Sequence, residues 1–273
     1  MSAVVKGITW LTDAVSGKVA GQSAMAIVLA AQTHAPDRGA LPRIFGSSPL
    51  VPDARSAYRD ALVELAVGEV LDGLGQRWDV LHDLPLHEGT LEHLAIGPAG
   101  TFAVRTARYA GADVVVDGTR LLVDSEPQED LFLALEHADA ATTMLTRAAG
   151  GPVPVHPLLV IVDARRITVR RATGGVLVVA SGQLARALTR APAVASGDEV
   201  ARISDLADLE STWPEASEAH LDTQRLHWEF AGVCSEVRAA VVTRVLWAVV
   251  GFSITYGALW ALTAFFVGRL LRP

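Results

Sequence analysis

The sequence predicts an α/β fold, a mixed β-sheet flanked by helices, followed by one C-terminal transmembrane helix. Two observations predict the α/β part: short apolar segments typical of strands, and longer segments with apolar residues at helical spacing. A third observation predicts the membrane helix, because residues 245–268 contain no charged side chain. At about 1.5 Å per residue this stretch would span about 36 Å as a helix, which crosses a hydrocarbon core of about 30 Å. The alternative is a buried core helix.

Each element follows from its local pattern. Helices are predicted where apolar residues recur every three or four positions, at 54–74, 127–148, 182–188, 200–209 and 226–237. Strands are predicted over short apolar runs at 78–84, 91–96, 102–104, 114–116, 121–123, 158–162, 167–169 and 176–179. Pro127 is expected to open its helix, since proline fits the first helical position. The last helix is expected to continue into the membrane segment, since no proline interrupts residues 215–272.

Composition divides the chain into four parts: an N-terminal extension (1–52), the α/β domain (53–190), an acidic helical linker (191–240) and a transmembrane anchor (241–273). The α/β domain holds 13 basic against 18 acidic residues, a net charge of −5. Sequence-independent affinity for nucleic acid comes mostly from Lys and Arg side chains that neutralise phosphates. This composition therefore disfavours nucleic acid as a partner.

The two ends of the chain bear on its location. Residues 24–31 are apolar, which fits either a secretory signal or a helix packed on the domain. The single cysteine, Cys234, allows no internal disulfide and fits a reducing compartment. Two arginines flank the membrane segment on each side, so the positive-inside rule does not orient it. We expect a single-pass protein of the cell membrane, with the α/β domain in the cytoplasm.

Three short motifs follow one another in the α/β domain. They are Gly68-Glu69 on a predicted helix, Glu92-His93 on a predicted strand, and the Gly97–Gly100 turn between two strands. In this order they resemble the nuclease-related (NERD) domain family, and the resemblance covers roughly Arg55 to Arg190. It implies a restriction-endonuclease-like core.

The resemblance also implies a site, and one part of that site is altered. The family carries an acidic-x-lysine motif on the strand after the turn, where this chain has Arg105, Thr106 and Ala107. Glu69 and Glu92 match the positions that would hold a divalent metal, but Arg105 places a permanent cation where a carboxylate belongs. We expect Arg105 to pair with Glu92 or Glu69. Ala107 removes the lysine that would assist hydrolysis.

These substitutions favour a membrane-anchored NERD-like protein that is catalytically inactive, needs no cofactor, and serves as a binding or scaffolding module for a protein partner. The alternative is a membrane-tethered, Mg²⁺-dependent nuclease acting on DNA or RNA. Its ligands would be Glu69, Glu92 and a further carboxylate such as Asp83 or Glu88. A third hypothesis is a structural module whose acidic helices bind a basic partner.

Two other clusters are candidate sites. His82, His87 and His93 lack the spacing and the cysteine partner of a zinc site, which favours ordinary surface or hairpin histidines. An arginine cluster could contact phosphates, although a charged strand edge that discourages pairing is the favoured interpretation. It consists of Arg165, Arg166, Arg170 and Arg171.

The membrane segment has its own expected partners. Residues 245–268 would contact membrane lipid. Within them, Ser253, Gly257 and Ala261 follow at intervals of four, an arrangement of small residues that lets two helices approach closely. The sequence therefore offers this stripe as the contact of a homodimer.

Overall fold

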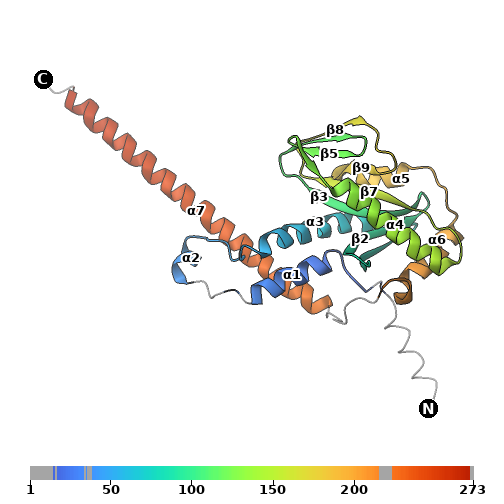
Figure 1. Ribbon diagram of the computed structural model, residues 1–273. Helices are drawn as coiled ribbons and strands as arrows, with labels where there is room; N and C mark the ends of the chain where they lie inside the picture. The colour runs from blue at the N-terminus through green and yellow to red at the C-terminus, as the bar shows by residue number, and fades with distance from the viewer. Residues whose placement is uncertain (1–14, 16, 34, 36–38, 215–222, 271–273) are drawn as a thin grey trace, which may run out of the picture. The chain divides into compact units, whose positions relative to one another are not determined.

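The computed structural model describes residues 15, 17–33, 35, 39–214 and 223–270, with side chains up to residue 263 (Figure 1). Contacts divide the chain into two units. The first, which we call the sheet unit, comprises Met1–Ala26 and Ser56–Leu226. The second, the anchor unit, comprises Ile27–Arg55 and His227–Pro273. Each unit is described by itself.

A five-stranded mixed sheet forms the centre of the sheet unit, as the sequence predicts. Its spatial order is β1-β2-β3-β7-β9, with an antiparallel β1-β2-β3 part and a parallel β3-β7-β9 part. Buried apolar residues on both faces of these strands make it the core of the unit. The strands are β1 (Asp79–Pro85), β2 (Thr90–Gly97), β3 (Gly100–Arg108), β7 (Val155–Val162) and β9 (Leu177–Ala180).

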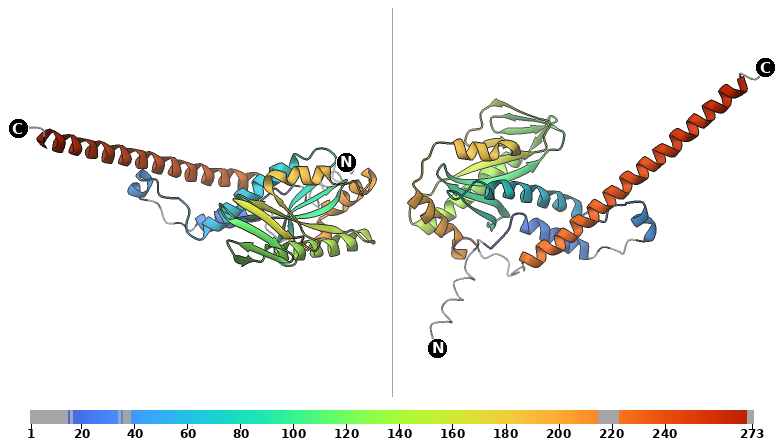
Figure 2. Two further views of the ribbon diagram at one scale, coloured as in Figure 1. Left: turned by 90° about the horizontal axis from the view of Figure 1, so that it is seen from above. Right: turned by 180° about the vertical axis from the view of Figure 1, so that it is seen from behind.

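Helices cover both faces of this sheet (Figures 1 and 2). On one face, α3 (Ala54–Asp72) and α5 (Leu184–Arg190) bury apolar side chains against β2, β3, β7 and β9. On the other face, α4 (Asp130–Ala149) and α6 (Gly197–Asp208) do the same against β1, β2 and β3. Two short 3₁₀ turns, η2 (Ser181–Gln183) and η3 (Glu210–Thr212), precede α5 and follow α6. This arrangement confirms the predicted α/β class.

A smaller four-stranded sheet includes one strand that the sequence analysis predicted as the start of a helix. Its order is β6 (Glu126–Gln128), β5 (Arg120–Val123), β4 (Asp113–Asp117) and β8 (Arg166–Arg171). The expectation that Pro127 opens a helix is wrong, because Pro127 lies in β6 opposite Leu122, and α4 begins at Asp130. The strand β6 is an edge strand, where a residue without an N–H donor is tolerated.

The described part of the acidic 191–240 segment contributes to the core rather than acting only as a linker. Ile203 and Ala207 of α6, together with Trp213, belong to the cluster that contains Leu94 and Met144. The Trp213 indole N–H donates to the Ala207 carbonyl at 2.8 Å, which fixes the chain just after the helix. Composition alone did not reveal this packing.

The anchor unit contains the predicted long helix. The helix α7 (Thr223–Leu270) is continuous over 48 residues and is long and apolar enough to cross a membrane. None of its apolar window is buried, so the alternative of a buried core helix is wrong. The helix α1 (Gln22–Thr33), which crosses the boundary between the units, confirms a helix at 24–31. A short helix, α2 (Ala40–Ile44), follows it in the N-terminal extension.

Candidate functional site

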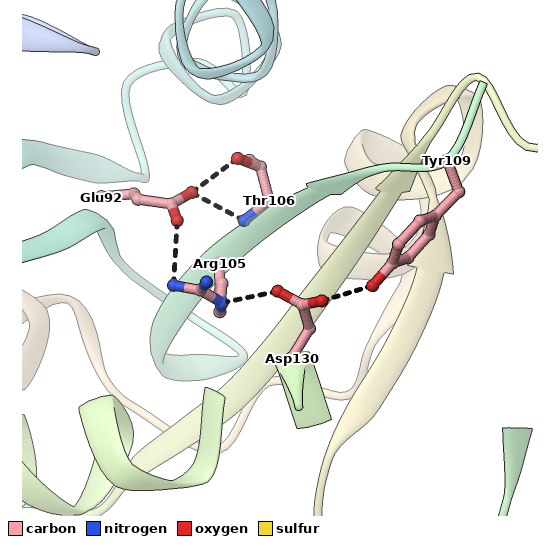
Figure 3. A network of polar contacts seen from close by, with 5 residues as sticks. All are labelled: Glu92, Arg105, Thr106, Tyr109 and Asp130. Atoms are coloured by element: carbon pink, nitrogen blue, oxygen red, sulfur yellow. Dashed lines mark hydrogen bonds and ion pairs between the residues drawn. The ribbon is translucent and has the colours of Figure 1, made fainter. Parts of the chain in front are cut away.

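The centre of the site is Glu92, held between two strands. The β2–β3 register pairs His93 with Val104, which brings Glu92 beside Arg105 and Thr106. Thr106 donates to one Glu92 carboxylate oxygen from its backbone N–H at 2.7 Å and from its hydroxyl at 2.6 Å. The Arg105 Nη1 atom donates to the other oxygen at 3.4 Å (Figure 3). The expected pairing of Arg105 with Glu92 is therefore present.

Arg105 also reaches a second carboxylate, one that the sequence did not indicate. Its Nε atom lies 3.1 Å from Asp130 Oδ1, in the first turn of α4. The Tyr109 hydroxyl donates to the other Asp130 oxygen. The Glu92, Arg105 and Asp130 side chains are only 13%, 21% and 19% exposed. The guanidinium thus bridges two largely buried carboxylates (Figure 3).

Two further acidic residues from α3 line the same cavity, which has a volume of about 380 Å³. Burial raises the pKa of Glu64, and the nearby Glu92, Asp83 and Asp60 carboxylates raise it further. Burial also raises the pKa of Glu92, although Arg105 and Thr106 act in the opposite direction. For both groups burial is the largest cause of the raised pKa. The cavity is lined by Asp60, Val63, Glu64, Glu92, Arg105, Thr106, Ala107, Arg108, Tyr109 and Asp130.

Glu69, the helix carboxylate expected in the site, does not line this cavity. It is exposed, five residues after Glu64. At about 100° per helical residue, five positions rotate the side chain by about 140° away from the face that carries Asp60 and Glu64. The four-residue spacing of Asp60 and Glu64 was visible in the sequence and could have indicated an acidic helix face. The structure does not bring Glu69 and Glu92 together.

The carboxylates of the alternative, Asp83 and Glu88, fall in different places. Asp83 lies between the pairs His82–His93 and Leu84–Leu91 and therefore opposite Glu92, with a φ of 54°. Its carboxylate accepts from the Ser23 N–H and hydroxyl, both at 2.9 Å, and Lys18 donates to its carbonyl at 3.1 Å. Glu88 is exposed in the turn after β1. Asp83 is close to Glu92 but is already hydrogen-bonded.

The residues present do not fit the divalent metal that the family resemblance implies. Two carboxylates that could hold the ion, Glu92 and Asp130, both pair with Arg105. Ala107 offers only a methyl group, and within the described part of the chain no lysine lines the cavity. Among the described residues, no group of three His, Cys, Asp or Glu side chains is arranged to hold a metal ion.

Beside the site, two of the three clustered histidines, His82 and His93, form a buried pair. Their Nδ1 atoms are 2.9 Å apart, and His82 Nε2 lies 3.0 Å from Asp72. Burial lowers the pKa of His93 to about 3, with a smaller contribution from His82. Gly68 packs over both rings, and a Cβ there would come within 2.5 Å of the Ala20 side chain. His87 is exposed and does not join the pair.

The arginine cluster lies on and beside β8, at the edge of the smaller sheet. Arg165 pairs with Asp113 at 2.7 Å, and Arg171 pairs with Asp117. Arg166 and Arg170 are exposed. Two of the four guanidinium groups are thus engaged across the sheet, which agrees with a charged strand edge, while phosphate contact stays a prediction.

A second cavity in the sheet unit, of about 570 Å³, lies near the β2–β3 turn and α6. Its lining includes Trp78, Pro98 and Val200. The hydroxyl of Ser204, a residue only 9% exposed, lies in this lining and has no partner among the described residues. No sequence pattern indicates this cavity, because its walls come from segments about 100 residues apart.

The described residues define a class of protein: an α/β domain with a carboxylate-lined cavity at a β-hairpin, in a chain that also carries a helix able to cross a membrane. Residues 59–162 match the family model described as the nuclease-related domain, NERD. This match confirms the resemblance to the NERD family over these residues. No curated protein and no solved structure matches the chain.

Proposed function

We propose that this protein is a membrane-anchored, non-hydrolytic NERD-domain module that binds or scaffolds a protein partner. One observation carries the proposal: the Arg105 guanidinium lies 3.4 Å from Glu92 and 3.1 Å from Asp130, between carboxylates that a metal-dependent nuclease would use. A fixed cation at this place repels a divalent ion and occupies its ligands.

The loss of lysine supports the same conclusion. The arginines that line the cavity, Arg105 and Arg108, keep their protons far above neutral pH and cannot replace lysine as a base. The module needs neither a metal nor another cofactor. The second cavity, with Trp78 and the unpartnered Ser204 hydroxyl, offers a partner a surface that does not depend on the nuclease-type residues.

The location follows from α7. We infer that α7 crosses the cell membrane once, with residues 245–268 in contact with lipid and the NERD domain in the cytoplasm. The lone Cys234 supports the reducing side. A reporter fused after Pro273 tests the orientation, because cytoplasmic activity of that reporter would contradict it.

A nuclease assay on the full chain in lipid nanodiscs tests the catalytic part of the proposal. DNA and RNA oligonucleotides are incubated with Mg²⁺ or Mn²⁺, and Glu92→Ala prepared in parallel serves as the control for contaminating nucleases. We expect both proteins to give the same background. Cleavage that depends on metal and disappears in Glu92→Ala would overturn the proposal.

That outcome would favour the second candidate function, a membrane-tethered Mg²⁺-dependent nuclease. It is supported by the presence of Asp60, Glu64 and Asp83 near Glu92, since carboxylates are the ligands Mg²⁺ uses. The double substitution Arg105→Glu, Ala107→Lys separates the two candidates further. We expect calorimetric titration with Mn²⁺ to show binding in this variant and not in the parent chain, and binding by both would favour the nuclease.

A further inference from the structure

In the anchor unit, the segment around α2 is fastened to α7 where the charge-free run begins. Arg244 donates to the Gly46 carbonyl from Nε at 3.3 Å and from Nη2 at 3.0 Å. The Trp247 indole N–H donates to the Ile44 carbonyl at 2.6 Å. The Phe45 and Trp247 ring centroids are 5.3 Å apart. These contacts join positions about 200 residues apart and fix α2 at one level of α7.

Gly46 makes this close approach feasible. Its φ is +68°, and a Cβ built there would lie 2.5 Å from the Ala240 carbonyl oxygen and 2.6 Å from the Arg244 nitrogen. Both atoms belong to the α7 backbone, which cannot move aside as a flexible side chain could. A larger residue would therefore push the segment away from α7.

The outer side of this segment is apolar and uncovered. Leu41, Ile44 and Phe45 are 67%, 52% and 54% exposed, and none of the α2 residues is buried. Arg43 is exposed beside them. A five-residue helix with no buried residue is not stabilised by packing in a protein core. Its exposed apolar side chains therefore require another explanation.

We propose that residues 40–45 form a second membrane contact, in which α2 lies in the interface of the leaflet that α7 enters. This inference rests on the proposed membrane anchor. Leu41, Ile44 and Phe45 enter the boundary of the acyl chains, while Arg43 faces the lipid phosphates. Leu246 and Val249 of α7 are apolar and exposed as well, as expected for a helix that enters lipid.

The position of Trp247 agrees with this placement. Indole rings gather at the level of the headgroups, and Trp247 holds the α2 segment at that level of α7. The chain enters and leaves the anchor unit at residues 26–27, 55–56 and 226–227, all before the charge-free run. The α2 contact therefore lies where α7 enters the membrane from its Thr223 end.

Depth-dependent fluorescence quenching tests the proposal on the full chain. The Cys234→Ser background receives one cysteine for an environment-sensitive fluorophore: Leu41→Cys, Phe252→Cys inside the candidate span, or Thr168→Cys on the exposed strand β8. Each protein is reconstituted into vesicles of phosphatidylcholine and phosphatidylglycerol, with or without brominated acyl chains. We expect quenching of at least about twofold at positions 41 and 252 and none at 168.

The three probes separate the possible failures. Quenching at 252 without quenching at 41 would overturn the α2 contact and leave the membrane anchor standing. An unquenched probe at 252 would overturn the anchor and this inference together. The matched variant Gly46→Val in the Leu41→Cys protein tests the role of α7: quenching at 41 is expected to fall by at least half, and unchanged quenching would show that α7 does not position the segment.

Discussion

The Arg105→Met substitution gives the sharpest test of the site, because it removes one charge and keeps much of the side-chain volume. In the parent chain Arg105 pairs with both Glu92 and Asp130. Removing one member of a fully buried ion pair costs about 3 to 5 kcal/mol, since the other charge is left unpaired. The side chains here are 13% to 21% exposed, which reduces this cost. We therefore expect Arg105→Met to lower the free energy of unfolding by about 2 to 3 kcal/mol at pH 8.

The cost should depend on pH in a defined direction. Burial already raises the pKa of Glu92, and the loss of Arg105 raises it further. A carboxyl group with a raised pKa in the folded state stays protonated while the unfolded chain ionises, so stability falls as pH rises above the ordinary value of about 4.3. At pH 5 the folded variant can protonate Glu92, and the cost should shrink below about 1 kcal/mol.

Thermal unfolding of the full chain in detergent, followed by tryptophan fluorescence, measures both effects. For a unit of this size, 2 to 3 kcal/mol corresponds to a decrease in melting temperature of about 4 to 12 °C. Arg108→Met is the matched control, because Arg108 pairs with Asp163 at the surface, where ion pairs contribute about 0 to 1 kcal/mol. Equal melting temperatures for Arg105→Met and Arg108→Met at pH 8 would refute the ion-pair account of the site.

Three other predictions concern the buried titratable groups and α7. Glu64→Gln should stabilise the protein by about 1 to 2 kcal/mol at pH 8 and have little effect at pH 4, because burial and neighbouring carboxylates raise the pKa of Glu64. Denaturant unfolding at the two pH values checks this, and equal gains at both would contradict it. Below about pH 6.5 the unfolded chain protonates His93, whereas the buried imidazole of the folded chain stays neutral, so the parent protein loses at most about 1.4 kcal/mol of stability per pH unit. His93→Leu should remove this contribution and make the protein less sensitive to acid. An unchanged acid unfolding midpoint would argue against this. Gly257→Leu should shift a homodimer joined through Ser253, Gly257 and Ala261 toward monomer in energy-transfer measurements between labelled chains in vesicles, and a parent chain that shows no transfer would exclude that dimer.

The fold was predictable where one local pattern dominates. Helical spacing located α3 and α6, and the charge-free run located the exposed part of α7. Pro127 misled the prediction because its missing N–H suits a helix start and an edge strand equally well. Only the pairing of β6 with β5 decides between them, and that pairing depends on residues outside the local window.

The site was predictable where the hairpin sets distances. The β2–β3 register pairs Gly97 with Gly100, so residues five positions before and five after the turn become neighbours, and these are Glu92 and Arg105. Asp130 and Glu64 reach the same point through the packing of α4 and α3 on opposite faces of the sheet. No spacing along the chain encodes that meeting. Glu69 was expected in the site because the Gly68-Glu69 pair resembles the family's motif.

The charge at position 105 decides what the remaining carboxylates can do. Four carboxyl groups line the cavity beside this one bridging cation: Asp60, Glu64, Glu92 and Asp130. Arg105→Met should therefore gain some stabilisation by Mg²⁺ or Mn²⁺, because a divalent ion then meets no competing guanidinium. Arg105→Glu, Ala107→Lys adds a ligand as well, so its response should be larger. Equal responses from the two variants would show that relief of repulsion suffices, whereas a response from the double variant alone would show that the site lacks a ligand rather than merely carrying the wrong charge.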